Sequence, residues 1–179
     1  AELTALLNPI IAKTDKLFVM LDTSHAGQGL SSSQLAQGFI NQNDEGRLRV
    51  KFVQSSAACN QPAKTSARSV LADTAAQKAA GQDIVFAFNS AKNEASFDDD
   101  EKGGLTTQFM RDCLLRDAKD LNSSGAITLD EIKQCIQTKI NIRMLGDATF
   151  KAPQLALYGN IDFVPSRFSQ AAAAPGHKP

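Results

Sequence analysis

The spacing of apolar and polar residues predicts both helices and strands in this chain. Three segments repeat apolar side chains every three to four positions and are predicted to form amphipathic helices: 2–13, 105–118 and 129–145. Three short runs are apolar almost throughout and are predicted to be strands buried on both faces: 16–22, 84–88 and 155–158. This order of elements favours an α/β domain with a mostly parallel central sheet.

The segment between the first two predicted strands is the least regular part of the chain. Residues 28–66 are rich in Ser, Gln, Asn and Gly, and only 48–53 alternates apolar and polar residues as a small strand would. The alanine-rich residues 69–80 are predicted to form a further helix. We therefore expect one domain over residues 1–165, followed by a disordered Ala/Pro-rich tail over 166–179.

Charge and hydropathy narrow the classes of partner. The 179 residues include 19 lysines and arginines and 19 aspartates and glutamates, so the formal net charge is zero. This balance provides no basic surface field of the kind that attracts nucleic acid. No apolar run reaches the roughly 20 residues of a membrane-spanning helix, and no signal-peptide pattern is present. We expect neither nucleic acid nor a membrane as partner, while the composition leaves cytoplasmic and exported locations open.

Polar residues gather where the first predicted strand ends. Residues 22–27 read Asp-Thr-Ser-His-Ala-Gly, and open α/β sheets bind their ligands at the carboxyl ends of strands. Ser24 and His25 do not by themselves indicate a serine protease, because neighbouring strand residues point to opposite faces. The Gly-x-Ser-x-Gly turn of α/β-hydrolases is also missing around Ser24. Considered alone, the pattern is typical of a polar strand-to-loop turn.

Together with three later segments, this strand end resembles the nucleophile region of caspase-like peptidases of the metacaspase and bacterial type. In that family the strand ends in Asp, a small residue, Cys, His, Ser or Ala, and Gly, and here Ser24 stands at the cysteine position. The later matching segments follow in the family's order: 90–97, 103–107 and 158–163. The resemblance covers roughly residues 2–165. It implies a caspase-like three-layer sandwich, α/β in class, whose N-terminal strands are missing from this chain.

The resemblance implies a cysteine endopeptidase that cleaves after Arg or Lys and requires no cofactor. Ser24 would hold the nucleophile position and Gly27 would belong to the active-site loop, while the family's catalytic histidine would lie upstream of this chain. Asp22 matches the aspartate that binds the basic substrate side chain, with Asn93 and Glu94 expected beside it. The implied partners are a peptide or protein substrate and the chain's own N-terminal segment, as a processed subunit. Basic residues of the long loop are candidate self-processing sites, although such residues are more often solvated charges: Arg47, Arg49, Lys51, Lys64 and Arg68.

A serine at position 24 is expected to make the chain inactive as written. A thiol with a pKa near 8.5 readily yields the nucleophilic thiolate, whereas a hydroxyl is far harder to deprotonate. Two interpretations remain open. Ser24 is an introduced substitution in an enzyme, which the well-kept surrounding motif favours, or it is natural in a non-catalytic caspase-like protein that acts as an interaction module.

The stretch between the last two predicted helices matches the calcium-binding loop of EF-hands. Its oxygen ligands would come in order from six positions: Asp120, Asn122, Ser124, the Ala126 carbonyl, Thr128 and Glu131. Only two of these are carboxylates, so any calcium affinity is expected to be low. The alternative, which we favour, is a structural connection in which Asp120 and Gly125 form the turn and Thr128 caps the following helix.

The three cysteines do not have the spacing of a metal site. Cys113 and Cys135 fall on two successive predicted helices, where they could face each other. Two interpretations remain open: a pair of small buried hydrophobic residues, which we favour, or a disulfide in an exported protein.

Overall fold

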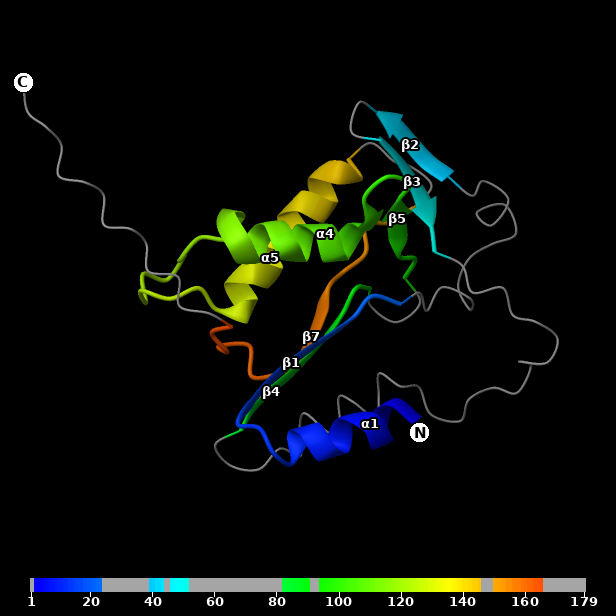
Figure 1. The fold of residues 1–179 in the computed structure, drawn as a ribbon. Helices are drawn as coiled ribbons and strands as arrows, with labels where there is room; N and C mark the ends of the chain where they lie inside the picture. The colour runs from blue at the N-terminus through cyan, green and yellow to red at the C-terminus, as the bar shows by residue number, and fades with distance from the viewer. Residues whose placement is uncertain are drawn as a thin grey trace, which may run out of the picture.

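The computed structural model of the 179-residue chain describes residues 2–23, 39–43, 46–51, 82–90, 94–145 and 150–165. The helix expected at 69–80, the tail at 166–179 and most of the Ser/Gln/Asn/Gly-rich segment lie outside the described residues. The described part contains three α-helices and two small sheets, which confirms a mixed α/β architecture (Figure 1). None of its helices is long and apolar enough to cross a membrane.

The first sheet contains the three apolar strands predicted from the sequence. Their order is β1 (Lys16–Leu21), β4 (Asp83–Phe88) and β7 (Ala156–Gly159). β1 and β4 are parallel, and Leu21 lies opposite Phe88 at their carboxyl ends. β7 runs antiparallel to β4. The expectation of a mostly parallel sheet is therefore wrong for this sheet, because one of its two pairings is antiparallel.

The antiparallel strand follows from the pair of helices between β4 and β7. α4 (Leu105–Asp112) begins beside the carboxyl end of β4, where the Thr106 hydroxyl donates to the Asn89 carbonyl. α5 (Leu129–Arg143) begins at the opposite edge, where its first amide donates to the carbonyl of Phe163, just beyond β7. Two successive helices thus return the chain to the edge from which it departed. The next strand must then run back against β4.

The second sheet is fully antiparallel and was only partly predicted. Its order is β2 (Phe39–Asn43), β3 (Gly46–Val50), β5 (Phe97–Asp99) and β6 (Gly103–Gly104). β3 confirms the strand expected from the alternation at 48–53, although it begins and ends earlier. The other three strands were not predicted, because two or three residues are too few to show alternation and β2 is mostly polar.

A helix forms in the segment predicted at 105–118, but its geometry changes from α-helical to π-helical at Cys113. There α4 passes into a π-helical segment, η3 (Cys113–Asp117), which ends where the Ala118 amide donates to the Cys113 carbonyl. α5 starts with a capping box in which the Thr128 hydroxyl accepts from the Glu131 amide and the Glu131 carboxylate accepts from the Thr128 amide. The predicted role of Thr128 as the cap of this helix is confirmed.

Helices cover both faces of the β1–β4–β7 sheet (Figure 1). On one face α1 (Glu2–Ile11) packs Leu7 against alternate β4 residues, namely Ile84, Phe86 and Phe88. The two β4 residues between them join the larger cluster with α4 and α5 on the other face. β4 is therefore buried on both faces, as its unbroken apolar sequence predicts.

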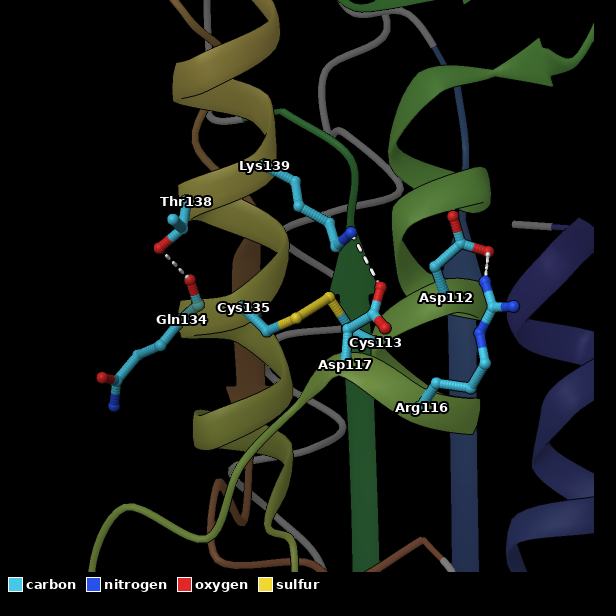
Figure 2. The surroundings of a disulfide bond; sticks show 8 residues. All are labelled: Asp112, Cys113, Arg116, Asp117, Gln134, Cys135, Thr138 and Lys139. Atoms are coloured by element: carbon cyan, nitrogen blue, oxygen red, sulfur yellow. Dashed lines mark hydrogen bonds and ion pairs between the residues drawn. A yellow bond between two sulfur atoms is a disulfide. The ribbon is translucent and has the colours of Figure 1, made fainter.

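A disulfide joins the two helical segments on either side of the 118–128 connection. Cys113 at the start of η3 pairs with Cys135 in α5, with their Cα atoms 6.0 Å apart (Figure 2). The favoured expectation of two unpaired thiols is therefore wrong, because the packing of the helices brings the sulfur atoms within bonding distance. Beside the bond, Lys139 Nζ lies 2.8 Å from Asp117 Oδ2. The hydrogen bond from Lys139 holds the pKa of Asp117 below its ordinary value.

Candidate functional site

The parallel pairing of β1 and β4 brings two polar residues together just beyond the carboxyl ends of the strands. Asp22 follows β1 and Asn89 follows β4. The backbone N–H of Asn89 donates to the Leu21 carbonyl at 3.3 Å. Asn89 is fully buried, whereas the Asp22 side chain is 19% exposed. The edge at which open α/β sheets bind ligands therefore carries a partly exposed carboxylate beside a buried amide.

Donors from three other segments bind the Asp22 carboxylate. Asp22 Oδ1 accepts from Asn89 Nδ2 at 2.5 Å and from Lys51 Nζ, just after β3, also at 2.5 Å. Asp22 Oδ2 accepts from the hydroxyl of Thr107, in the first turn of α4, at 2.5 Å. Hydrogen bonds to an ionised group are roughly twice as strong as neutral ones. The carboxylate is therefore held in place by residues from both sheets and a helix.

Space for this carboxylate depends on the glycine at position 104. A Cβ atom on Gly104 would overlap Asp22 Oδ2 and would lie 3.0 Å from Lys51 Nζ. The φ angle of Gly104 is −53°, which any residue can adopt. The close approach of Asp22, and not backbone freedom, is therefore what requires glycine here.

Two carboxylates share the Lys51 ammonium. Lys51 Nζ lies 3.0 Å from Asp98 Oδ1 in β5, in addition to its contact with Asp22. The Lys51 side chain is 14% exposed and the Asp98 side chain 41%, so the group opens toward solvent on the Asp98 side. Two carboxylates thus bind one ammonium through charge-assisted contacts, which are stronger than contacts between neutral groups.

Two buried polar atoms near this group have no hydrogen-bond partner among the described residues: Asn89 Oδ1 and Ser96 Oγ. Asn89 uses its amide nitrogen on Asp22. Ser96 directly precedes β5, and its carbonyl accepts from the Lys51 amide at 2.8 Å. An unsatisfied buried polar atom costs about 1–3 kcal/mol, and such atoms call for a functional or structural reason. Both atoms belong to residues in contact with this group, Asn89 through the Asp22 carboxylate and Ser96 through the backbone of Lys51.

The residues expected around the nucleophile are only partly placed. Asp22 lies at the centre of the group just described. Ser24, Gly27 and Asn93 fall outside the described residues, so the expected nucleophile position and active-site loop stay predictions.

Glu94, expected beside Asp22, has contacts with the segment that leads into β7. Its carboxylate accepts from the Gln154 amide at 2.7 Å and lies 3.7 Å from Lys151 Nζ. Among the described residues, Asp98 shares the Lys51 ammonium with Asp22.

Sequence reasoning did not place four members of the group beside Asp22: Lys51, which was expected only as a candidate self-processing site, Asn89, Asp98 and Thr107. For two of them, the sequence contains a feature that could have pointed to the site. Asn89 ends an apolar strand just as Asp22 does, and Thr107 belongs to the 103–107 segment of the family resemblance. Lys51 and Asp98 come from the second sheet, and nothing in their local sequence indicates that they approach β1.

The last segment of the resemblance lies at the other edge of the sheet. Asn160 Nδ2 donates to Asp83 Oδ1 at 2.7 Å, where β4 begins. Gly159 has a φ of +115°, and a Cβ atom there would overlap the Ile84 carbonyl. Residues 158–163 therefore position β7 against β4 and do not contribute to the Asp22 group.

The loop that matches an EF-hand is closed by its own hydrogen bonds. The two oxygens of Asp120 accept from the amides of Ser124 at 3.0 Å and Gly125 at 2.7 Å. Asn122 Oδ1 accepts from the Ser124 amide at 2.9 Å. Gly125 has a φ of +81°, the left-handed conformation that the sharp turn requires.

Glu131, the last expected calcium ligand, is buried and accepts hydrogen bonds on both oxygens. Its Oε1 accepts from the Leu121 amide at 2.7 Å, and its Oε2 accepts from the Thr128 amide at 2.8 Å. These bonds, that from Thr128 above all, hold the pKa of Glu131 below its ordinary value. Among the described residues, no group of three or more His, Cys, Asp or Glu side chains is arranged to hold a metal ion.

Comparisons with protein-family models, with curated proteins and with solved structures found no match to this chain. The function must therefore be inferred from the residues and their contacts.

Proposed function

We propose that the chain carries the substrate-binding site of a caspase-like peptidase, in which Asp22 binds the Lys or Arg side chain of a peptide. The observation that carries this proposal is the Lys51 ammonium, which lies 2.5 Å from Asp22 and 3.0 Å from Asp98. The group thus already binds a basic side chain, and the chain itself supplies that side chain. The position at the carboxyl end of β1, two residues before Ser24, is the one that the resemblance implies.

With serine at position 24, the proposed function of this chain is to bind the peptide without cleaving it. A peptidase of this class needs a thiolate that attacks the carbonyl after the bound basic residue. The Ser24 hydroxyl does not ionise near neutral pH, so a site built around a thiolate keeps recognition and loses most of the chemistry. The competing proposal, a natural interaction module, predicts the same binding and differs only in what a cysteine at this position would do.

Peptide binding provides the test. Fluorescein-labelled peptides that differ only in one central residue, Arg, Lys, Gln or Leu, are titrated with the protein and followed by fluorescence anisotropy. We expect the Arg and Lys peptides to bind at least about tenfold more tightly than the Gln peptide, because a charge-assisted pair contributes roughly 1.5–3 kcal/mol. Asp22→Asn should abolish this preference.

Asp100→Asn is the matched control. Asp100 is a nearby carboxylate that pairs with Arg49 at 2.6 Å, so its loss should not change the preference for basic peptides. Equal binding of the Arg and Gln peptides by the unmodified protein and by Lys51→Met would refute the proposed function. Ser24→Cys in the full-length protein then separates the two forms of the proposal: cleavage after Arg or Lys supports an enzyme, and continued inactivity supports an interaction module.

A second candidate function is weak calcium binding by the loop at 120–131. The observation that favours it is the left-handed Gly125, around which Asp120 and Asn122 gather loop amides in the order that an EF-hand uses. A bidentate calcium ligand and the capping box both need the Glu131 carboxylate, so metal must compete with the helix cap. Affinity should therefore lie at the weak, millimolar end of the range for such loops.

Isothermal titration with calcium chloride tests the loop. Asp120→Asn should remove the heat of binding, whereas Asp130→Asn should leave it unchanged, because Asp130 is not at a ligand position and accepts from Gln134 on the helix surface. A titration without heat at millimolar calcium would eliminate this candidate function and leave the loop a purely structural connection.

A further inference from the structure

Lys51 is more buried than its place in the strand pattern predicts. In β3, Leu48 and Val50 point into the core while Arg47 and Arg49 lie at the surface. Lys51 continues the exposed series, and the Arg49 side chain two residues earlier is 56% exposed. The Lys51 side chain is only 14% exposed, because its ammonium turns toward two carboxylates.

The backbone and the side chain of Lys51 are held independently. The Lys51 amide donates to the Ser96 carbonyl at 2.8 Å, which ties the end of β3 to the residue before β5. Among the described residues, the ammonium contacts Asp22 and Asp98, at the far end of a flexible four-carbon side chain. Movement of the ammonium past Asp98 into solvent would therefore leave the strand pairing unchanged.

When the ammonium leaves, its two carboxylates face the vacated space. Asp22 keeps the neutral donors of Asn89 and Thr107, and Asp98 remains open to solvent. Two negative charges then converge on a space that previously held one cation. A guanidinium is better suited to this space than the lysine ammonium, because its planar fork can bind two carboxylates at once.

We propose that Lys51 is an internal ligand that competes with the basic side chain of an incoming peptide for Asp22 and Asp98. This inference rests on the proposed function, since it assigns the occupant and the regulation of the same site. Lys51 and the peptide bind in mutually exclusive states. The apparent affinity for peptide is therefore lowered by the fraction of molecules in which Lys51 is bound.

Removal of the lysine charge tests the competition directly. Lys51→Met keeps the aliphatic side chain and should raise the affinity for the Arg peptide by about tenfold or more, as expected if Lys51 is bound in at least nine molecules of ten. Arg49→Met, which removes one positive charge from the same face of the strand, should raise it much less. Asp22→Asn added to Lys51→Met should remove the gain.

Acetylation of the unmodified protein gives a second, independent measurement. Limited acetylation followed by mass spectrometry should find Lys51 protected relative to the exposed Lys102 and Lys151, and saturating Arg peptide should increase Lys51 labelling several-fold. Equal affinity of Lys51→Met and the unmodified protein for the Arg peptide, or unchanged Lys51 labelling with bound peptide, overturns the internal ligand and leaves the proposed function standing. If no variant prefers Arg over Gln peptides, the proposed function is refuted and the internal ligand with it.

Discussion

Loss of the Cys113–Cys135 bond is expected to lower the free energy of unfolding by about 3 kcal/mol. The bond joins residues 22 positions apart. For a closed loop of that length, the chain-entropy relation gives a loss of about 11 cal/mol/K, or about 3.4 kcal/mol at 25 °C. The contact between α4 and α5 keeps its buried apolar side chains when the bond is absent, so we expect the reduced protein still to fold.

Urea unfolding followed by circular dichroism measures the difference between oxidised and reduced protein. Cys113 is buried, so the reduced sample is prepared by unfolding and refolding in dithiothreitol. A Cys59→Ala background removes the third thiol and with it any disulfide exchange. Thiol titration of the unreduced, denatured wild type should find one reactive thiol among the three cysteines. Three reactive thiols, or free energies of unfolding equal within about 0.5 kcal/mol, would refute the reasoning.

Three further contacts allow predictions of how substitutions change stability or peptide binding. Gly104→Ala should destabilise the protein by roughly 2–3 kcal/mol and abolish peptide binding, because the added Cβ displaces the Asp22 carboxylate. Gly103→Ala strains only a left-handed backbone and should keep peptide binding. Thr128→Ala should cost about 1 kcal/mol in urea unfolding through the lost cap, and Thr138→Ala on the exposed face of the same helix should cost little. Because the pKa of Glu131 is held below its ordinary value of 4.5, its stabilisation should be complete above pH 4.5 and decline as the pH falls further, and Glu131→Gln should flatten that decline in thermal melts. A decline of the same steepness in Glu131→Gln would contradict this assignment.

The amphipathic helices and the continuously apolar strands of this chain are predictable from its sequence. The direction of the strands and most strands of the second sheet are not. The strands β1, β4 and β7 follow from their apolar runs, and the helices around Met110 and Ile136 follow from their periodic apolar positions, because burial of these side chains decides the local structure. Strand direction is different. It depends on how many times the chain crosses the sheet between strands, and the helix pair before β7 reverses the direction that the apolar pattern alone suggests.

The candidate site was predictable only where it coincides with the end of an apolar strand. The strand pattern placed Asp22 at the sheet edge, because it follows a buried strand, and the family resemblance gave it the role of a substrate-binding residue. Lys51 and Asp98 could not be placed beside it, because they reach Asp22 through the pairing of β3 with β5, which no local pattern encodes. Nor could the requirement for glycine at position 104 be derived from the sequence, since it arises from a carboxylate 82 positions earlier in the chain (104 minus 22).

The position of β4 in the middle of its sheet has a consequence for how the molecule melts. Alternate residues of this strand belong to two different hydrophobic clusters, with Phe86 on the α1 side and Ala87 on the side of α4 and α5. Loss of either cluster exposes one face of the same strand and weakens its pairing with both neighbours. The two layers are therefore expected to unfold together in one cooperative transition, with β4 as the element that couples them.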